Sequence, residues 1–235
     1  MINEQNFIYH KSRENPQYLF ENWYNNAKEF HFKTNNILFD LILWFVRFAL
    51  KFSIKLFPEL NELFSRDIVA LGTVDKEAKP KVRMVLFKGL YDGNFSFFSN
   101  YDSDKGIELE NNPRVSMTFY FRFPPRQIRI EGQVEKMNTN DSDAYWKSRG
   151  RDSRIGAIVS KQSRPLKNYE QLVEDFMNEK ENVIGTENIA RPENWGGYLI
   201  KPTIIEFWEG KANRLHDRYR FKFMDGSWFK THLYP

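Results

Sequence analysis

A series of strand-like segments between residues 67 and 137 constrains the fold of this chain most strongly. In Gln127–Met137, Ile128 and Ile130 alternate with Arg129 and Glu131, as expected for a strand with one buried face. Further segments precede it without regularly intervening helices: Asp67–Val74, Lys81–Lys88, Asn94–Ser99 and Val115–Phe121. Strands in such a series favour antiparallel pairing. We therefore predict a mainly β (α+β) fold, an antiparallel barrel with peripheral helices.

The remaining segments predict helices around the barrel and strands at the C-terminus. Leu19, Phe20, Trp23 and Ala27 have helical spacing after Asn15-Pro16. Further helices are expected at Ser103–Asn111, near Asp141–Ser148 and at Tyr169–Glu179. The C-terminal strands are expected at Thr203–Trp208, Arg218–Phe223 and Trp228–Leu233. Asp225-Gly226 predicts a tight hairpin between the last two.

The stretch Ile37–Phe57 is strongly apolar, yet it does not have the pattern of a membrane span. Arg47 would lie near the middle of the bilayer, at a cost of roughly 2.5–3.5 kcal/mol. Asp40, Arg47, Lys51 and Lys55 fall along one helical face. We expect an amphipathic helix that packs on the core or on a partner surface, with a membrane surface as the less favoured target.

Composition excludes several classes of site. The 235 residues include no cysteine, which excludes disulfides, thiolate metal sites and cysteine nucleophiles. The histidines are isolated in the sequence, so no metal site is predicted. The net charge of +4 comes from charges mixed through the chain, which argues against nucleic acid as a partner. The N-terminus lacks the layout of a secretory signal, and we expect a cytoplasmic protein.

Two clusters of polar residues could bind an anion. Lys105 falls in the first turn of a predicted helix that opens at Ser103, where backbone N–H groups and the ammonium could hold a phosphate. A solvated pair of charges on a turn explains the same residues. The run Arg214–Arg218 places His216 between two arginines, which suits an anionic aromatic ligand. By themselves these residues indicate a phosphate-bearing ligand and no particular reaction.

Eight short motifs make the prediction more specific. They are RMVLFK (83–88), SDKG (103–106), RQIRIEG (126–132), SRIGA (153–157), SKQS (160–163), WGGY (195–198), IEFWEG (205–210) and NRLHDR (213–218). In this order and at these separations they resemble the pyridoxamine/pyridoxine 5′-phosphate oxidase family. The resemblance implies a split β-barrel homodimer with one FMN at each of two sites between the subunits. It implies oxidation of pyridoxamine 5′-phosphate or pyridoxine 5′-phosphate to pyridoxal 5′-phosphate, with O₂ reduced to hydrogen peroxide.

The resemblance also implies roles for individual residues. The FMN-binding set is Arg83, Met84, Val85, Leu86, Phe87, Lys88, Phe98, Ser99, Lys105, Gln127, Gln162, Ser163, Trp208 and Arg218. The substrate-binding set is Lys88, Tyr145, Arg149, Ser153, Arg214, Leu215 and His216, with Tyr145, Arg149 and Ser153 at the substrate phosphate. Arg214 and His216 are the expected catalytic residues, and they hold the substrate over the flavin.

The chain departs from the family pattern in its N-terminal region and at residue 104. We expect residues 1–66 to form a helical segment with an atypical apolar insertion at about 34–64, and residues 67–235 to form the FMN-binding oxidase domain. The N-terminus offers only His10–Arg13 as a candidate cover for the substrate. Asp104 replaces the family's usual arginine, and a carboxylate there repels a phosphate unless it turns outward. We therefore expect weaker FMN binding than is usual in the family.

Two other functions remain open at this point. The chain could be an FMN- or pyridoxal-phosphate-binding protein of the same fold with little or no turnover, because of Asp104 and the insertion. It could instead be another flavin or deazaflavin oxidoreductase on the same barrel. The two sets of residues that suit a pyridoxal-type phosphate argue against the latter.

Overall fold

The computed structural model describes residues 10–11, 14–28, 67–122, 124–186 and 188–235. The apolar stretch 37–57, the insertion at about 34–64 and the side chains of residues 10–13 lie outside this description. Among the described helices, none combines the length and the apolar character needed to span a membrane.

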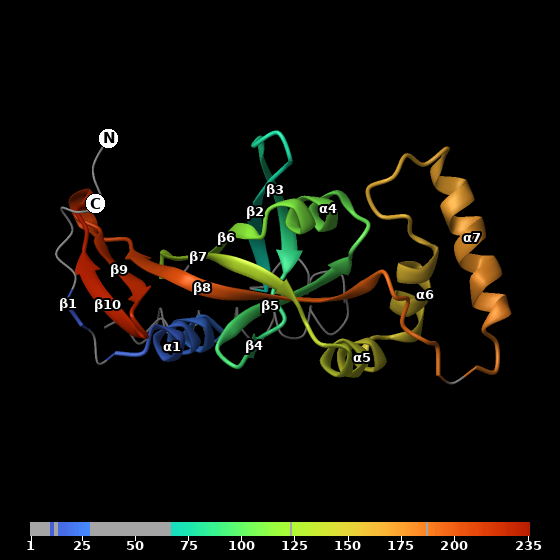
Figure 1. Ribbon diagram of the computed structural model, residues 1–235, viewed down its shortest axis with the longest axis horizontal. Coiled ribbons are helices and arrows are strands. Elements are labelled where there is room, and N and C mark those ends of the chain that lie inside the picture. Colours follow the sequence, from blue (N-terminus) through green and yellow to red (C-terminus); the bar gives the residue numbers. More distant parts are fainter. Residues whose placement is uncertain (1–9, 12–13, 29–66, 123, 187) are drawn as a thin grey trace, which may run out of the picture. The chain divides into compact units, whose positions relative to one another are not determined.

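The elements follow one another along the chain as shown in Figure 1. The strands are β1 (His10–Lys11), β2 (Ile68–Val74), β3 (Pro80–Leu86), β4 (Leu90–Tyr91), β5 (Asn94–Asn100), β6 (Arg114–Phe121), β7 (Arg126–Lys136), β8 (Trp195–Glu209), β9 (Asp217–Met224) and β10 (Ser227–His232). The helices are α1 (Pro16–Lys28), α4 (Asp104–Asn111), α5 (Thr139–Ser148), α6 (Arg151–Val159) and α7 (Tyr169–Asn182), with a 3₁₀ turn η2 at Ala212–Arg214.

Strands β2, β3, β5, β6, β7 and β8 form a closed six-stranded antiparallel barrel. Strand β5 pairs with β8, with Phe97 opposite Tyr198. The segment that follows β3 is hydrogen-bonded to β5: the Lys88 amide donates to the Ser96 carbonyl at 2.9 Å. Ile128 and Ile130 are fully buried, as the alternation in β7 predicts. The predicted antiparallel barrel with peripheral helices is confirmed.

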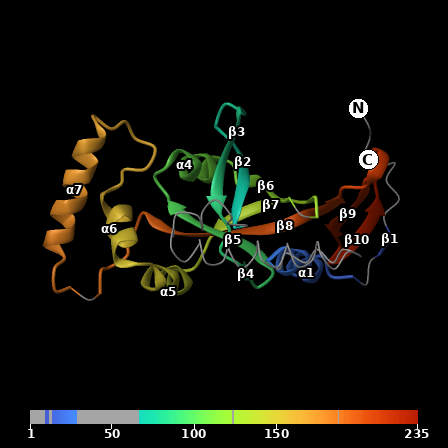
Figure 2. The same ribbon diagram turned by 180° about the vertical axis from the view of Figure 1, so that it is seen from behind.

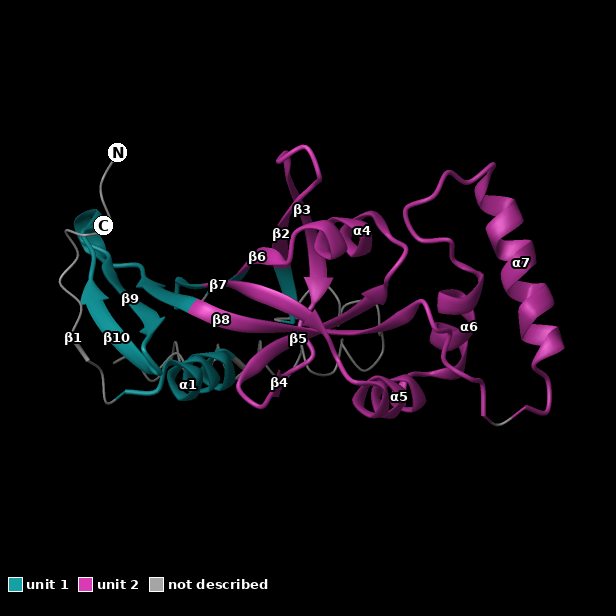
Figure 3. Cartoon of the chain, in the orientation of Figure 1, with its two compact units in different colours: residues 1–69, 118–129, 204–235 teal, residues 70–117, 130–203 magenta. Residues whose placement is uncertain are grey.

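The chain separates into two compact units, each built from segments distant in sequence (Figure 3). Unit 2 contains residues 70–117 and 130–203. Helices α5, α6 and α7 pack around the buried side chains of Trp146, Ile155, Ile189 and Trp195. Helices α6 and α7 lie side by side when seen from the front and from behind (Figure 2). These three helices therefore share a small apolar core.

Unit 1 contains residues 1–69, 118–129 and 204–235. Helix α1 buries Phe20 and Trp23, whose rings lie 4.9 Å from Phe119 and 5.1 Å from Phe207, respectively. Strands β9 and β10 form the predicted hairpin. Asp225 (φ 49°) and Gly226 (φ 72°) both have the left-handed conformation that a tight two-residue turn requires.

The predicted elements were incomplete at two places. The strand expected at Thr203–Trp208 is present, but it is the second part of β8, which starts at Trp195 and includes Gly196 and Gly197. A Cβ at Gly196 would lie 2.1 Å from the Tyr101 hydroxyl, so close packing explains this glycine. Helix α6 was not predicted; Gly156 and several β-branched residues weaken its helical signal.

Candidate functional site

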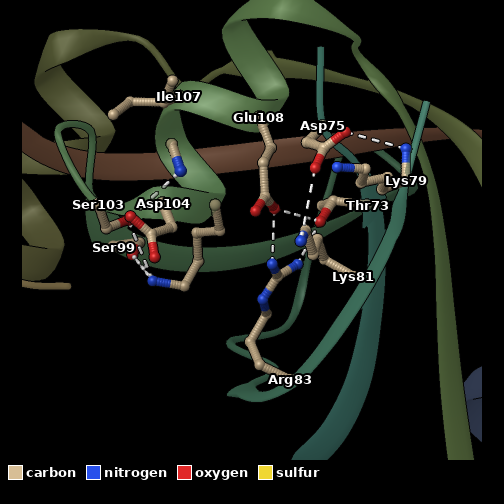
Figure 4. A network of polar contacts seen from close by, with 12 residues as sticks. Thr73, Asp75, Lys79, Lys81, Arg83, Ser99, Ser103, Asp104, Ile107 and Glu108 are labelled. Atoms are coloured by element: carbon tan, nitrogen blue, oxygen red, sulfur yellow. Dashed lines mark hydrogen bonds and ion pairs between the residues drawn. The ribbon is translucent and has the colours of Figure 1, made fainter. Parts of the chain in front are cut away.

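Arg83 is held on strand β3 by buried partners of unit 2 (Figure 4). Its guanidinium contacts the Glu108 carboxylate at 2.6 Å and donates to the Thr73 hydroxyl. The Thr73 hydroxyl also donates to Glu108 at 2.5 Å. Thr73 and Glu108 are buried, so this triad fixes the arginine before any ligand arrives.

Lys105 lies in the first turn of α4 and is 8% exposed. Its ammonium donates to Ser99 Oγ at 3.0 Å and to Ser103 Oγ at 3.1 Å. Burial, reinforced by repulsion from Arg83, lowers the pKa of Lys105, although Asp104 and Glu108 act in the opposite direction. The hydrogen-bond partners of this buried cation are hydroxyls, which leaves it suited to an anionic ligand.

The turn that carries Lys105 is fixed by its neighbours. Ser103 caps α4, and its Oγ accepts a hydrogen bond from the Gly106 amide. A Cβ at residue 106 would lie 2.0 Å from the Tyr101 carbonyl oxygen, so only glycine fits. Gln162 Oε1 accepts hydrogen bonds from Ser99 Oγ at 3.2 Å and from the Asn100 amide at 3.3 Å. Ser163 follows with a left-handed φ of 68°.

The other predicted site residues along and just after β3 alternate in exposure. Met84 and Leu86 are exposed, Val85 and Lys88 are partly buried, and Phe87 is buried in the core. Together with Val82, the first two leave an apolar row on the strand. Phe87 packs 6.0 Å from Phe95, so its predicted contact with flavin can come only from its backbone.

An aromatic stack borders the residues of unit 2 that were predicted to bind the substrate phosphate. Phe98 stacks on Tyr145 with 3.7 Å between ring centroids, and Trp195 lies 5.6 Å from Phe98. Arg149 lies over the Trp195 ring at 4.7 Å and donates to the Ser153 carbonyl at 2.8 Å. The structure thus brings Tyr145, Arg149 and Ser153 together at the junction of α5 and α6. Burial lowers the pKa of Arg149, whose Nε is buried without a hydrogen-bond partner among the described residues.

Arg218 belongs to a buried ion cluster in unit 1. It donates to Glu206 at 2.7 Å, and Arg220 donates to the other oxygen of the same carboxylate at 2.9 Å. Arg129 approaches it to 3.7 Å. Burial favours the neutral carboxyl, but the bonds from Arg218 and Arg220 outweigh this effect and lower the pKa of Glu206. The Nε of Arg218 is buried and has no partner within the described chain.

The turn before β9 presents the predicted catalytic residues. The rings of Trp208 and His216 lie 4.7 Å apart, and His216 Nδ1 accepts a hydrogen bond from the Lys211 amide. Arg214 is exposed and has a left-handed φ of 60°. Its guanidinium has no hydrogen bond or ion pair to the part of the chain that is described. Leu215 is 70% exposed, so the turn presents Arg214 and Leu215 to solvent, whereas His216 packs against Trp208.

The predicted site residues fall into two groups that belong to different units. Unit 2 holds Arg83–Lys88, Phe98, Ser99, Lys105, Tyr145, Arg149, Ser153, Gln162 and Ser163, whereas unit 1 holds Gln127, Trp208, Arg214, Leu215, His216 and Arg218. Gln127 is partly buried on β7. A pocket of about 700 Å³ opens among β2, β3, β6, β7 and β8, and none of the predicted residues lines it.

Sequence reasoning missed the residues that hold these cations. Thr73 and Glu108 fix Arg83, and Glu206 fixes Arg218. A signal existed for Glu206, because a carboxylate between Ile205 and Phe207 is unusual in an apolar strand and faces Arg220 across the sheet. Glu108 had no such signal, since Glu is ordinary on a helix.

The donor set fits a phosphorylated flavin. In unit 2, Lys105, the Ser99 and Ser103 hydroxyls and Gln162 lie around the start of α4, where they could hold a phosphate group. In unit 1, Arg218 has a buried Nε without an acceptor among the described residues. Among the described residues no group of His, Asp and Glu side chains could hold a metal ion. The residues thus favour an organic anion as ligand.

Two family models match the chain. The model for pyridoxamine 5′-phosphate oxidase matches residues 56–178, and that for the pyridoxine 5′-phosphate oxidase C-terminal dimerisation region matches residues 195–235. Together they cover all the predicted site residues.

Individual relatives agree with the family models. The pyridoxine/pyridoxamine 5′-phosphate oxidase of Bacteroides fragilis is 47% identical over 166 residues, 70% of each chain. That of Pseudomonas putida is 44% identical over 167 residues, 71% of this chain and 77% of the relative. A crystal structure of PhzG from Burkholderia lata, in complex with tetrahydrophenazine-1-carboxylic acid, has a TM-score of 0.69 at 26% identity and covers 77% of this chain and 90% of that one. The chain belongs to the pyridoxine/pyridoxamine 5′-phosphate oxidase family.

Proposed function

We propose that this protein is an FMN-dependent oxidase that converts pyridoxamine 5′-phosphate and pyridoxine 5′-phosphate to pyridoxal 5′-phosphate. The alcohol substrate and O₂ give the aldehyde and hydrogen peroxide. The amine substrate additionally consumes water and releases ammonia. Residues 67–235 form the oxidase domain, and we expect it to act in the cytoplasm, in keeping with a chain without cysteine.

The observation that carries this proposal is a pair of cationic positions in unit 2. Lys105 lies at the start of α4 with hydroxyl partners, and Arg149 lies between α5 and α6 with a free buried Nε. A flavin phosphate and a substrate phosphate would each satisfy one of them. The relatives named for phosphorylated substrates support the same assignment.

The chain's own side chains position the reactants. Arg83 and Lys105 hold the cofactor, with Ser99 and Gln162 as neutral partners. Arg149, Tyr145 and Ser153 bind the substrate phosphate, and Arg214 and His216 hold the pyridine ring. FMN held by these residues would supply the redox chemistry, as acceptor of a hydride from the substrate C4′ and donor of the electrons to O₂. The protein contributes orientation and electrostatics, so no nucleophilic side chain is needed.

We propose a homodimer in which residues of both subunits complete each site. The exposed apolar row Val82, Met84 and Leu86 suits burial against a second subunit. The match of residues 195–235 to a dimerisation region supports this arrangement. The unit 1 group (Gln127, Trp208, Arg214, Leu215, His216 and Arg218) would then serve the flavin held by the partner's unit 2.

The test is aerobic turnover of the FMN-supplemented protein with each substrate, following pyridoxal 5′-phosphate and hydrogen peroxide together. We expect equal amounts of the two products, and no turnover of pyridoxamine, which lacks the phosphate. FMN binding without either product from both substrates would instead support a binding protein. Equal turnover of pyridoxamine would contradict the role given to Arg149.

A further inference from the structure

Asp104 carries a negative charge beside the predicted flavin phosphate site, and the structure pairs it with Arg164. Asp104 opens α4 and immediately precedes Lys105. Arg164 Nη2 donates to Asp104 Oδ1, and the two side chains are 44% and 62% exposed. An exposed ion pair of this kind adds little to the stability of the fold.

The Asp104 carboxylate is close enough to act on that site. It raises the pKa of Lys105 by Coulombic attraction, against the lowering by burial. The same field would repel a phosphate dianion bound to Lys105. A guanidinium on the carboxylate cancels this field and leaves Lys105 as the effective charge.

The segment that carries Arg164 is anchored independently. Gln162 is bonded to Ser99 and Asn100, and the Arg164 amide donates to the Lys161 carbonyl at 2.9 Å. Ser163, between them, has a left-handed backbone. These bonds place Arg164 at the first turn of α4, so its pairing with Asp104 follows from the loop's own conformation.

We propose that Arg164 is a positioning residue that neutralises Asp104 and so allows the Lys105 site to bind the FMN phosphate. This inference rests on the proposed function. It replaces the expectation of weak FMN binding, because the carboxylate turns outward to a partner. Arg164 need not touch the flavin for this role.

A double-mutant cycle at Asp104 and Arg164 tests this proposal, with FMN affinity measured by flavin fluorescence titration. Arg164→Gln should weaken FMN binding about fivefold to tenfold, because Asp104 then faces the phosphate uncompensated. Asp104→Asn/Arg164→Gln should return the affinity to within about twofold of wild type, since no net charge remains to repel. Riboflavin, which lacks the phosphate, should bind all variants equally. In about 1 M salt the loss in Arg164→Gln should shrink, because screening then acts within about 3 Å.

Lys167→Gln is the matched control, since it removes an exposed cation of the same loop and should leave FMN binding unchanged. Thermal melts would establish that each variant is folded. An Arg164→Gln variant that binds FMN like wild type would overturn the inference alone. So would a double variant as weak as Arg164→Gln. Wild-type protein that binds no FMN would overturn the proposed function, and this inference with it.

Discussion

The cations around α4 and the turn that carries Arg214 differ in how firmly they are held. Arg83 is fixed by buried Thr73 and Glu108, and Lys105 by two serine hydroxyls. Arg214, in contrast, is exposed, with a left-handed backbone and no polar partner within the described chain. One region is arranged before a ligand binds, and the other presents its side chain to solvent.

This difference suggests a division of labour between cofactor and substrate. A cofactor that stays bound benefits from cations fixed in advance, because no ordering cost is then paid on binding. A residue that must admit and release a substrate at each turnover cannot be buried in the same way.

Arg214→Ala tests whether the exposed arginine acts on the substrate and not on the cofactor. We expect kcat to fall by about 10²–10³-fold, as for the loss of a positioned charged donor, while FMN binding remains unchanged. Steady-state assays with pyridoxamine 5′-phosphate and FMN titrations measure the two quantities. Lys211→Ala, in the same turn, is the control and should keep full activity. A parallel loss of FMN would place Arg214 in the cofactor site.

Lys105→Met tests whether the buried lysine at the start of α4 binds the FMN phosphate. FMN affinity should fall by about 10–100-fold, because a charge-assisted bond to the phosphate is lost. Riboflavin affinity should change little. The protein without flavin should become more stable by about 1 kcal/mol, because a buried charge is replaced by an apolar side chain. Urea denaturation without flavin measures this gain, and a loss of stability would contradict the account of Lys105.

The lowered pKa of Lys105 gives this variant a pH signature. Below the folded-state pKa, the folded protein bears the full cost of the buried charge. As the pH rises from that value toward the unfolded pKa of 10.5, the unfolded chain binds more protons, and the flavin-free wild type gains stability relative to Lys105→Met. Denaturation of both proteins at several alkaline pH values measures this change in relative stability. A stability difference that does not change with pH would mean that the pKa of Lys105 is not lowered.

Glu206→Gln asks whether Arg218 is also fixed in advance. Removing the charge that holds Arg218 and Arg220 should destabilise the protein by about 3 kcal/mol at neutral pH. Because the pKa of Glu206 is lowered, its contribution is present above pH 4.5 and is lost as the pH falls through the folded-state value. The difference between wild type and variant should therefore disappear in acid. A difference that persists there would indicate a packing effect.

Ser153→Ala should have the smallest effect. Arg149 bonds to the backbone carbonyl of Ser153, which the substitution keeps, so only the hydroxyl is lost. We expect KM for pyridoxamine 5′-phosphate to rise about threefold with kcat unchanged, the effect of one neutral hydrogen bond. A loss of activity comparable to that of Arg214→Ala would show that Ser153 does more than bind phosphate.

Most of the fold could be predicted from the sequence because its strands alternate clearly. The β7 pattern and the Asp225-Gly226 turn led directly to observed elements. The prediction gave only Thr203–Trp208 of strand β8, since Gly196, Gly197 and Pro202 are residues that are uncommon inside strands. Close packing explains both glycines: a Cβ at Gly196 would lie 2.1 Å from the Tyr101 hydroxyl oxygen, and one at Gly197 would lie 2.7 Å from Met137 Sδ.

The sequence allowed the site residues to be predicted, but not the residues that hold them in place. Motif order identified Arg83, Lys105 and Arg218. Their partners Thr73, Glu108 and Glu206 come from other elements, and pairwise contacts across a fold leave little trace in one sequence. The same holds for Asp104, since its partner Arg164 is 60 residues away.

The most direct test of the proposed oxidase is an anaerobic half-reaction. FMN-loaded protein is mixed with pyridoxamine 5′-phosphate without oxygen, and the flavin absorbance is followed. We predict loss of the oxidised flavin band with one equivalent of pyridoxal 5′-phosphate, and return of the band when air is admitted. Pyridoxamine should bleach it far more slowly. A flavin band that stays unchanged with both pyridoxamine 5′-phosphate and pyridoxine 5′-phosphate would contradict the proposed function.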